Sequence, residues 1–235
     1  MILKGRTALI TGGTRGVGRA IAERLVREGA AVAICGRSAA TVQSAVGSIS
    51  STGGKVCGTE ADISSLESVQ RLFDFVDRQL GGLDILVNNA GIAILRHTAD
   101  LKSEQWQQTL ATNLSGVFYC CQEAIVRFRK RGGGFIVNIG SLLGKTGVTG
   151  GAAYCASKFG LNGLSEAMML DCRQENIGVC TILPGSIDTE LFGASAGSEW
   201  KIHPGDIAQM VTAILEMQGR TLVSRVEMRP LRPAK

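Results

Sequence analysis

The chain has 235 residues with 45% hydrophobic and 19% charged side chains, a composition typical of a globular protein with a large core. No linker, repeat or low-complexity tract divides it, so we expect a single domain over residues 1–235. The net charge of +5 is modest and the basic residues are scattered, which argues against a nucleic-acid partner. No apolar run is long enough to cross a membrane.

The cysteines and histidines argue against a disulfide framework and against a metal site. The seven cysteines are odd in number, form no Cys-x-x-Cys pair and mostly lie in apolar segments. The two histidines, His97 and His203, are far apart and lack the spacing of a metal-binding pair. We therefore expect no bound metal and free thiols in a reducing compartment. The start, residues 1–6, shows no signal peptide, so we expect a cytoplasmic protein.

The first predicted strand, residues 7–10, leads directly into a glycine-rich turn and a helix. The turn, Thr11–Gly18, has glycines at positions 12, 13, 16 and 18, and apolar residues then recur at helical spacing. Glycines let a backbone approach a pyrophosphate, and the helix N-terminus adds N–H groups and a positive dipole. This stretch predicts a dinucleotide site; a plain tight turn is the alternative. The turn contains no Gly-Lys-Ser/Thr, which excludes a nucleoside triphosphate loop at this point of the chain.

The end of the second predicted strand, residues 31–34, indicates which dinucleotide binds. An NAD site commonly has a carboxylate there, whereas an NADP site uses arginine for the 2′-phosphate. The chain has Arg37 and Ser38 at this point, and no acidic residue occurs over positions 29–59. Arg15 in the glycine-rich turn could reach the same phosphate. Either arginine alone could be a solvated surface charge, but together they favour NADP(H) over NAD(H).

Two further predicted strands end in candidates for cofactor contacts. After the strand over 56–59, Asp62 could contact adenine or cap the helix that follows. The strand over 83–87 ends in Asn88-Asn89-Ala90-Gly91. These small and amide residues suit a cofactor floor lined by backbone, or they make only a turn.

A long predicted helix from Trp106 to about Lys130 has an apolar side and contains Asn113. It ends in a basic run, residues 127–131, followed by three glycines. Cations and a glycine cap at a helix C-terminus are a favourable structural arrangement. The same cations could dock an acidic carrier protein, but the structural interpretation already accounts for the cluster.

After the fifth predicted strand, residues 135–139, come Ser141 and the stretch Tyr154-Cys155-Ala156-Ser157-Lys158. Tyr154 and Lys158 are four residues apart and so share one face of a predicted helix, a spacing that also occurs by chance. A free phenol has a pKa of about 10, and we expect the Lys158 ammonium to lower the pKa of Tyr154. Tyr154 could then exchange a proton with an alcohol oxygen that the Ser141 hydroxyl holds.

The last part of the chain completes an alternation of strands and helices. We expect strands over 179–183 and 222–226 with a helix over 206–217 between them. A short segment at about 190–203 could close over a substrate. The whole pattern predicts an α/β protein with a doubly wound, mostly parallel sheet, whose ligand lies across the carboxyl ends of the strands.

Together these motifs resemble the short-chain dehydrogenase/reductase family, and most of all its 3-oxoacyl-carrier-protein reductase group. The matching motifs are Thr11-Gly12-x-x-x-Gly16-x-Gly18, Asp62, Asn88-Asn89-Ala90-Gly91, Asn113, Ser141, Tyr154-x-x-x-Lys158 and Pro184-Gly185. The resemblance implies one Rossmann-type domain of three layers with about seven parallel strands. It also implies a catalytic tetrad. Tyr154 would be the general acid/base, Ser141 would hold the substrate oxygen, Lys158 would bind the nicotinamide ribose, and Asn113 would hold a water on the proton path.

The motifs and the resemblance also give a set of expected cofactor contacts. These residues are Gly12, Thr14, Arg15, Gly16, Val17, Gly18, Arg37, Ser38, Asp62, Ile63, Asn89, Ala90, Gly91, Tyr154, Lys158, Pro184, Gly185, Ile187 and Thr189. Ile187 and Thr189 would contact the nicotinamide end. The apolar helices over 106–130 and 154–176 would pair with their mates in a homo-oligomer, a tetramer or a dimer.

The expected function is NADPH-dependent reduction of a ketone or aldehyde, with Tyr154 as the general acid. An NAD(P)-dependent alcohol or sugar dehydrogenase working in the oxidative direction is the alternative. A non-catalytic dinucleotide-binding regulator is a remote third alternative for the function, because no catalytic residue is missing. The chain departs from many relatives at its end, where Val226–Pro233 replaces an Asp-Gly-Gly, and in the short segment before His203. Both departures leave the substrate unassigned, including a fatty-acyl one.

Overall fold

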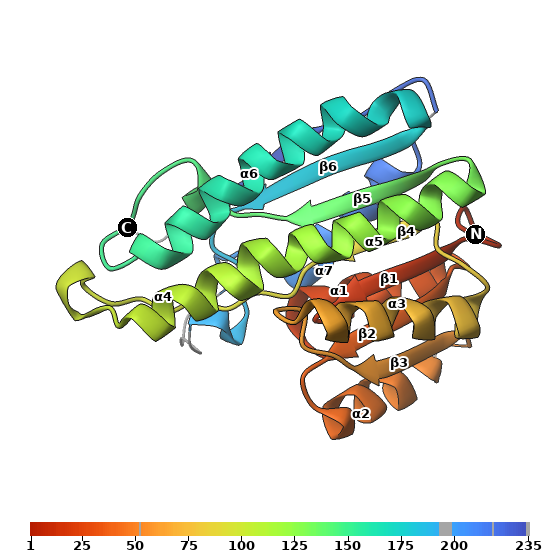
Figure 1. Ribbon diagram of the computed structural model, residues 1–235, viewed down its shortest axis with the longest axis horizontal. Helices are drawn as coiled ribbons and strands as arrows, with labels where there is room; N and C mark the ends of the chain where they lie inside the picture. The colour runs from red at the N-terminus through yellow and green to blue at the C-terminus, as the bar shows by residue number, and fades with distance from the viewer. Residues whose placement is uncertain (52, 193–198, 218, 234–235) are drawn as a thin grey trace.

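The computed structural model consists of a parallel sheet between two layers of helices, and it describes residues 1–51, 53–192, 199–217 and 219–233 (Figure 1). The strands are β1 (Thr7–Thr11), β2 (Ala31–Gly36), β3 (Val56–Glu60), β4 (Ile85–Asn88), β5 (Gly134–Ile139), β6 (Ile177–Pro184) and β7 (Arg225–Met228). They pair in the order β3-β2-β1-β4-β5-β6-β7, all in parallel. The predicted doubly wound, three-layer fold with seven strands is confirmed.

Helices cover both faces of the sheet, and the strands β1 to β6 supply side chains to two cores. The helices are α1 (Gly16–Arg27), α2 (Ala39–Ser50), α3 (Leu66–Leu80), α4 (Ser103–Leu110), α5 (Gly116–Arg131), α6 (Ala152–Cys172) and α7 (Pro204–Leu215). In β1, Ile10 packs with residues of α1, α2 and α7, whereas its neighbour Leu9 packs with residues of α3, α5 and α6. Successive side chains of a strand point to opposite faces, which explains why β1 is buried along its whole length.

Four strands begin at residues other than those that the sequence predicts: β5 and β6 begin one and two residues earlier, and β4 and β7 begin two and three residues later. β4 begins at Ile85 because the Asp84 carboxylate is buried against β1, where it accepts hydrogen bonds from the backbone N–H and the hydroxyl of Thr7. β7 begins at Arg225 because its pairing with β6 starts at Thr181. The apolar pair at 222–223 favoured an earlier strand, but it lies in the connection that precedes the pairing.

The predicted helix over 106–130 is interrupted by a single π turn, Ala111–Ser115, that joins α4 to α5. In this turn the Gly116 N–H donates to the carbonyl of Ala111, five residues back. Such turns often occur at functional sites. The turn carries Asn113 and lies at the carboxyl end of the sheet.

Candidate active site

The tyrosine, lysine and serine that the sequence predicts as catalytic meet at the carboxyl end of β5. Ser141 follows this strand, and its side chain shares a hydrogen bond with that of Tyr154, in the first turn of α6. The Lys158 ammonium donates to the carbonyl of Ile139 at 2.9 Å and lies 5.8 Å from the centre of the Tyr154 ring. All three side chains are buried. The fold therefore brings a phenol, a hydroxyl and an ammonium together in one place.

Burial sets the protonation of this group. It raises the pKa of Tyr154 to about 12, and the hydrogen bond with Ser141 offsets only part of that rise. Burial also lowers the pKa of Lys158 to about 8. Tyr154 therefore does not have the lowered pKa that the sequence predicts, because loss of water around the phenol raises it above its ordinary value. Tyr154 keeps its proton at neutral pH, and Lys158 titrates not far above it.

The side chain of Asn113 joins the catalytic helix to the loop after β4. Its Oδ1 accepts from the N–H of Ile92 at 2.9 Å, and its Nδ2 donates to the carbonyl of Ile92 at 2.9 Å. The same Nδ2 donates to the Ser157 hydroxyl at 3.1 Å, and that hydroxyl donates to the carbonyl of Tyr154 at 2.7 Å. Asn113 thus connects to Tyr154 through Ser157, a residue to which the sequence reasoning gave no role.

The glycine-rich turn packs closely against the loop after β4. Gly12 has a φ of +64°, and a Cβ there would lie 2.9 Å from the Cα of Ala90. A Cβ on Gly18 would lie 2.3 Å from the Nδ2 of Asn89. That Nδ2 donates to the carbonyls of Thr11 and Gly12, at 3.0 Å each, so Asn89 braces the turn. The result is a backbone-lined cradle at the N-terminus of α1, which fits the pyrophosphate of a dinucleotide.

The residues expected at the adenosine end lie where β2 and β3 finish. Arg37 and Ser38 are exposed between β2 and α2, and Arg37 makes no hydrogen bond or ion pair within the described parts of the chain. The carboxylate of Asp62 accepts from the backbone and hydroxyl of Ser64, and the cap of α3 is Ser65. Of its two predicted roles, Asp62 therefore does not cap that helix.

A carboxylate that the sequence reasoning did not consider also lies at this end. Glu60 is the last residue of β3 and is paired in register with Gly36 of β2. Its Oε2 accepts from the backbone N–H of Ala39, at the start of α2, at 3.2 Å. The sequence does mark Glu60, because the stretch without acidic residues ends there. Its position beside the end of β2, however, follows only from the register in which β2 and β3 pair.

Arg15, the other arginine assigned to the phosphate, is paired with an acid far along the chain. Its guanidinium donates to the Glu190 carboxylate at 2.8 Å, and the two side chains are 76% and 72% exposed. Thr189, next to this acid, lies against the glycine-rich turn, 3.5 Å from where a Cβ on Gly16 would be. The start of the predicted lid is therefore held beside the turn. Its centre, residues 193–198, lies outside the described residues.

The other expected cofactor residues lie along the same edge of the sheet. Thr14 and Val17 belong to the turn and first helix, Ile63 follows β3, and Gly91 follows β4. After β6, the Gly185 N–H donates to the carbonyl of Met228, and Ile187 forms a bridge with Ile202. The structure thus collects every predicted site residue at one end of the sheet.

The basic run at the end of α5 is largely neutralised within the chain. Arg127 pairs with Asp74, Asp77 and Glu123. Arg129 pairs with Glu175, and Arg131 pairs with Asp84, while Gly132 ends the helix in the left-handed conformation. These contacts favour the structural interpretation of the cluster over a carrier-protein dock.

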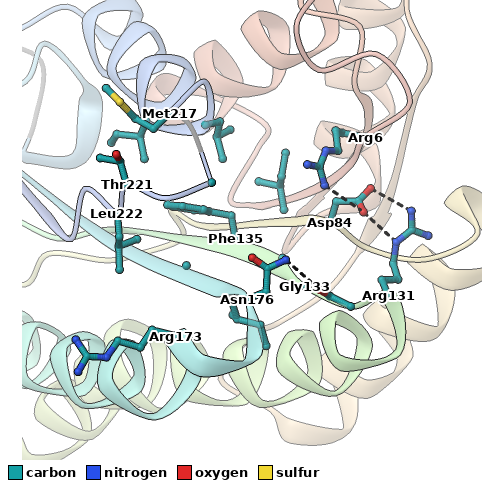
Figure 2. A pocket seen from close by; sticks show the side chains of 18 of the residues that line it. Arg6, Asp84, Arg131, Gly133, Phe135, Arg173, Asn176, Met217, Thr221 and Leu222 are labelled. Carbon is teal, nitrogen blue, oxygen red and sulfur yellow. Dashed lines mark hydrogen bonds and ion pairs between the residues drawn. The ribbon is translucent and has the colours of Figure 1, made fainter.

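A hollow of about 330 Å³ lies at the opposite, amino end of the sheet (Figure 2). Figure 2 shows Phe135, Leu222 and Met217 around it, with Asp84 bound between Arg6 and Arg131. The hollow contains none of the predicted site residues. It is separated from Tyr154 by the length of the strands, so we do not assign the reaction to it.

Over the described ranges no cluster of three or more His, Cys, Asp or Glu side chains is placed to hold a metal ion. Within those ranges, too, every helix is too short or too polar to cross a membrane. All seven cysteines are free, and all but Cys57 are buried.

Comparison with known proteins agrees with this fold. The family model for short chain dehydrogenase matches residues 6–199. The chain is 38% identical over 201 residues to the 3beta-hydroxysteroid dehydrogenase of Mediterraneibacter gnavus, covering 85% of this chain and 72% of that protein. It is 36% identical over 190 residues to the 3-oxoacyl-[acyl-carrier-protein] reductase of Aquifex aeolicus, covering 80% and 77%.

A solved structure gives the same result. A metagenomic short-chain oxidoreductase in complex with NADP superposes with a TM-score of 0.88 at 31% identity, covering 99% of this chain and 100% of that one. The chain belongs to the short-chain dehydrogenase/reductase family. It is an oxidoreductase of the class that acts on hydroxyl and carbonyl groups of small molecules, as the resemblance predicted.

Proposed function

We propose that this protein reduces a ketone or aldehyde to an alcohol with NADPH, and that Tyr154 is the general acid. The observation that carries the proposal is the buried contact of Tyr154 with Ser141, beside the Lys158 ammonium. Bound NADPH supplies a hydride to the carbonyl carbon. The chain's own residues then have to hold the carbonyl oxygen and deliver a proton to it.

Each residue of the tetrad has a part that its contacts support. The Ser141 hydroxyl holds the substrate oxygen, and Tyr154 gives that oxygen its proton. The Lys158 cation stabilises the phenolate that remains. Both side-chain N–H bonds of Asn113 are already engaged, so a water on the proton path would have to bind elsewhere in the π turn, such as at a backbone carbonyl.

The protonation of Tyr154 fits the role of a general acid. A phenol with a pKa of about 12 carries its proton at neutral pH, as a general acid must. Oxidation of an alcohol would instead need the phenolate as a base. The dehydrogenase alternative would therefore have to lower this pKa in the complex with cofactor and substrate.

The preference for NADPH rests on the two arginines at the adenosine end. Arg37 is exposed and unpaired in the described structure, so it is available to a 2′-phosphate, which carries nearly two negative charges at neutral pH. The solved relative that binds NADP supports the same choice. Two carboxylates argue against a preference for NADPH. Glu190 forms an ion pair with Arg15, and Glu60 accepts a hydrogen bond at the start of α2, near the expected phosphate site.

The test is the ratio of kcat/KM for NADPH to that for NADH, measured with a panel of carbonyl compounds. We expect Arg37→Asp to lower this ratio by about ten- to a hundredfold and to reverse the preference, because aspartate repels the phosphate and offers a carboxylate to the NAD ribose. Arg27→Asp is the control, since it makes the same charge change at the exposed end of α1, away from the site. A wild type that prefers NADH, or an unchanged ratio in Arg37→Asp, would show that the assignment is wrong.

We also propose that the protein is a cytoplasmic homo-oligomer. The long helices α5 and α6 carry exposed apolar side chains, Phe118 and Val126 on the first and Phe159 and Leu170 on the second. These are the helices that we predicted to pair between subunits, and a second copy would bury such residues. The free thiols support a reducing compartment. A mass near 24.7 kDa in light scattering at micromolar concentration would contradict the oligomer.

A further inference from the structure

Ser157 forms a buried link between the catalytic tyrosine and the π turn. Its side chain is fully buried, and its hydroxyl donates to the Tyr154 carbonyl at 2.7 Å. The same oxygen accepts from the Nδ2 of Asn113 at 3.1 Å. A serine hydroxyl has one hydrogen to donate, so its direction is fixed by these two partners.

Asn113 in turn fixes the loop that follows β4. Its amide makes a paired contact with the N–H and C=O of Ile92, at 2.9 Å each. Gly91, next in the chain to this residue, is one of the expected cofactor contacts. With the Ser157 bond, three hydrogen bonds hold a side chain that is itself buried, and buried polar networks of this kind are rigid only when every member is satisfied.

We propose that Ser157 is a positioning residue: through its hydroxyl it holds the Tyr154 turn of α6 in a fixed relation to Asn113 and to the cofactor-side loop at Ile92. The inference rests on the proposed reductase function, which gives this alignment its use. Proton delivery depends on the placement of the phenol relative to the carbonyl oxygen. Small displacements of catalytic groups reduce the rate strongly, whereas a residue that never faces the substrate leaves substrate binding nearly unchanged.

The chain contains a matched control for this role. Ser165 lies eight residues further along α6 and is also buried. Its hydroxyl donates to the carbonyl of Leu161 at 2.7 Å and accepts from the Nδ2 of Asn138 at 2.8 Å. Replacing either serine by alanine therefore removes the same two kinds of hydrogen bond from the same helix, but only Ser157→Ala breaks a link to Asn113 and Tyr154.

The experiment compares wild type, Ser157→Ala and Ser165→Ala in the NADPH-dependent reduction, with Tyr154→Phe as the test of the reaction itself. We expect both serine variants to lose a similar amount of stability in urea unfolding. Ser157→Ala should lower kcat by about tenfold with KM changed less than about twofold, while Ser165→Ala keeps kcat within about twofold. Hydrogen exchange followed by mass spectrometry, which needs no turnover, should show the Ile92 amide exchanging about tenfold faster in Ser157→Ala alone.

The outcomes separate the two proposals. If wild-type turnover depends on Tyr154 but the two serine variants match in kcat and in exchange at Ile92, the positioning role is wrong and the proposed function stands. If Tyr154→Phe is as active as wild type, or no carbonyl is reduced, the proposed function is wrong, and exchange at Ile92 alone decides whether Ser157 holds the loop. Should an alanine variant fail to fold, Ser157→Cys and Ser165→Cys keep the shape of the side chain with a weaker hydrogen-bonding group.

Discussion

The carboxyl and amino ends of the sheet carry polar groups in opposite ways. At the amino end Asp84 accepts from Thr7 twice. Figure 2 shows the same carboxylate paired with Arg6 and Arg131. Its charge is balanced within the chain. At the carboxyl end Arg37 stands exposed without a partner in the described structure, and the phenol of Tyr154 has the Ser141 hydroxyl beside it.

This difference follows from the directions of the helices. In Figure 1, α5 and α6 run back along the sheet from its carboxyl end. Their C-termini therefore collect at the amino end, where Arg129 and Arg131 in the last turn of α5 lie at the negative end of its dipole. The N-terminus of α1 lies at the other end and provides N–H groups for an anion. The amino end is thus built for stability and the carboxyl end for binding, which variants at each end can test.

The largest effect is expected at the carboxyl end, from Tyr154→Phe. The substitution keeps the buried ring and removes only the transferable proton. Turnover should fall by at least about a hundredfold, while cofactor affinity and the unfolding midpoint change little. Tyr119→Phe is the control, because Tyr119 is the only other tyrosine and lies in α5. Steady-state reduction rates and urea unfolding measure both properties; near-normal turnover in Tyr154→Phe would disprove the mechanism.

The opposite result is expected at the amino end, from Asp84→Asn. The amide cannot accept from Thr7 and both arginines at once, so a buried network is left partly unsatisfied. We expect a loss of about 2–3 kcal/mol in the free energy of unfolding, with kcat of the folded enzyme unchanged. Glu67→Gln in the exposed pair with Arg71 should change stability by less than about 0.5 kcal/mol. Equal losses in the two variants would contradict the proposed role of this end.

A smaller effect should appear in the pH dependence of stability, because Lys158 is a charge buried at the binding end. Its pKa is lowered from 10.5 to about 8, so the folded state releases the proton that the unfolded state still holds between these values. Its burial therefore costs stability at neutral pH, and the cost is relieved as the pH rises from about 8 towards 10.5.

The measurement is the difference in unfolding free energy between wild type and Lys158→Met at about pH 7 and about pH 10. The unfolding free energy of wild type, relative to that of the variant, should be larger at the higher pH by on the order of 1–2 kcal/mol. Lys130→Met removes an exposed lysine at the end of α5 and should show no such change. If the difference in unfolding free energy between wild type and Lys158→Met does not change with pH, burial of the Lys158 ammonium does not reduce stability.

Much of the fold was predictable from local signals. The strand, glycine-rich turn and helix at the start, and the apolar runs at regular intervals, each depend on a few consecutive residues, so the doubly wound sheet followed from them. The edge strand β7 was misplaced by three residues at its start because it is stabilised by pairing with β6 on one side, and pairing register is not encoded in its own sequence.

The predicted site residues lie together at one end of the sheet, but their interactions were less predictable. The pair of Arg15 with Glu190 joins residues 175 positions apart, and nothing local marks it. The pKa of Tyr154 was given the wrong direction because spacing shows the neighbouring lysine but not the loss of water around the phenol. Ser157 was overlooked because one serine inside a helix has no signal until its two partners are known.

The π turn at Asn113 has a consequence for how the chain tolerates insertions and deletions. A π turn contains one residue more than an α-helical turn, and each residue rotates a helix by about 100°. The extra residue therefore sets the apolar stripe of α5 out of phase with that of α4. Deleting one residue from 111–115 would restore an uninterrupted helix. Either α5 would then rotate and turn Cys120 and Phe128 away from the sheet, or α4 would rotate and change its position beside the active site. The number of residues in this segment, as well as its sequence, is therefore fixed by the position that the Asn113 side chain must occupy.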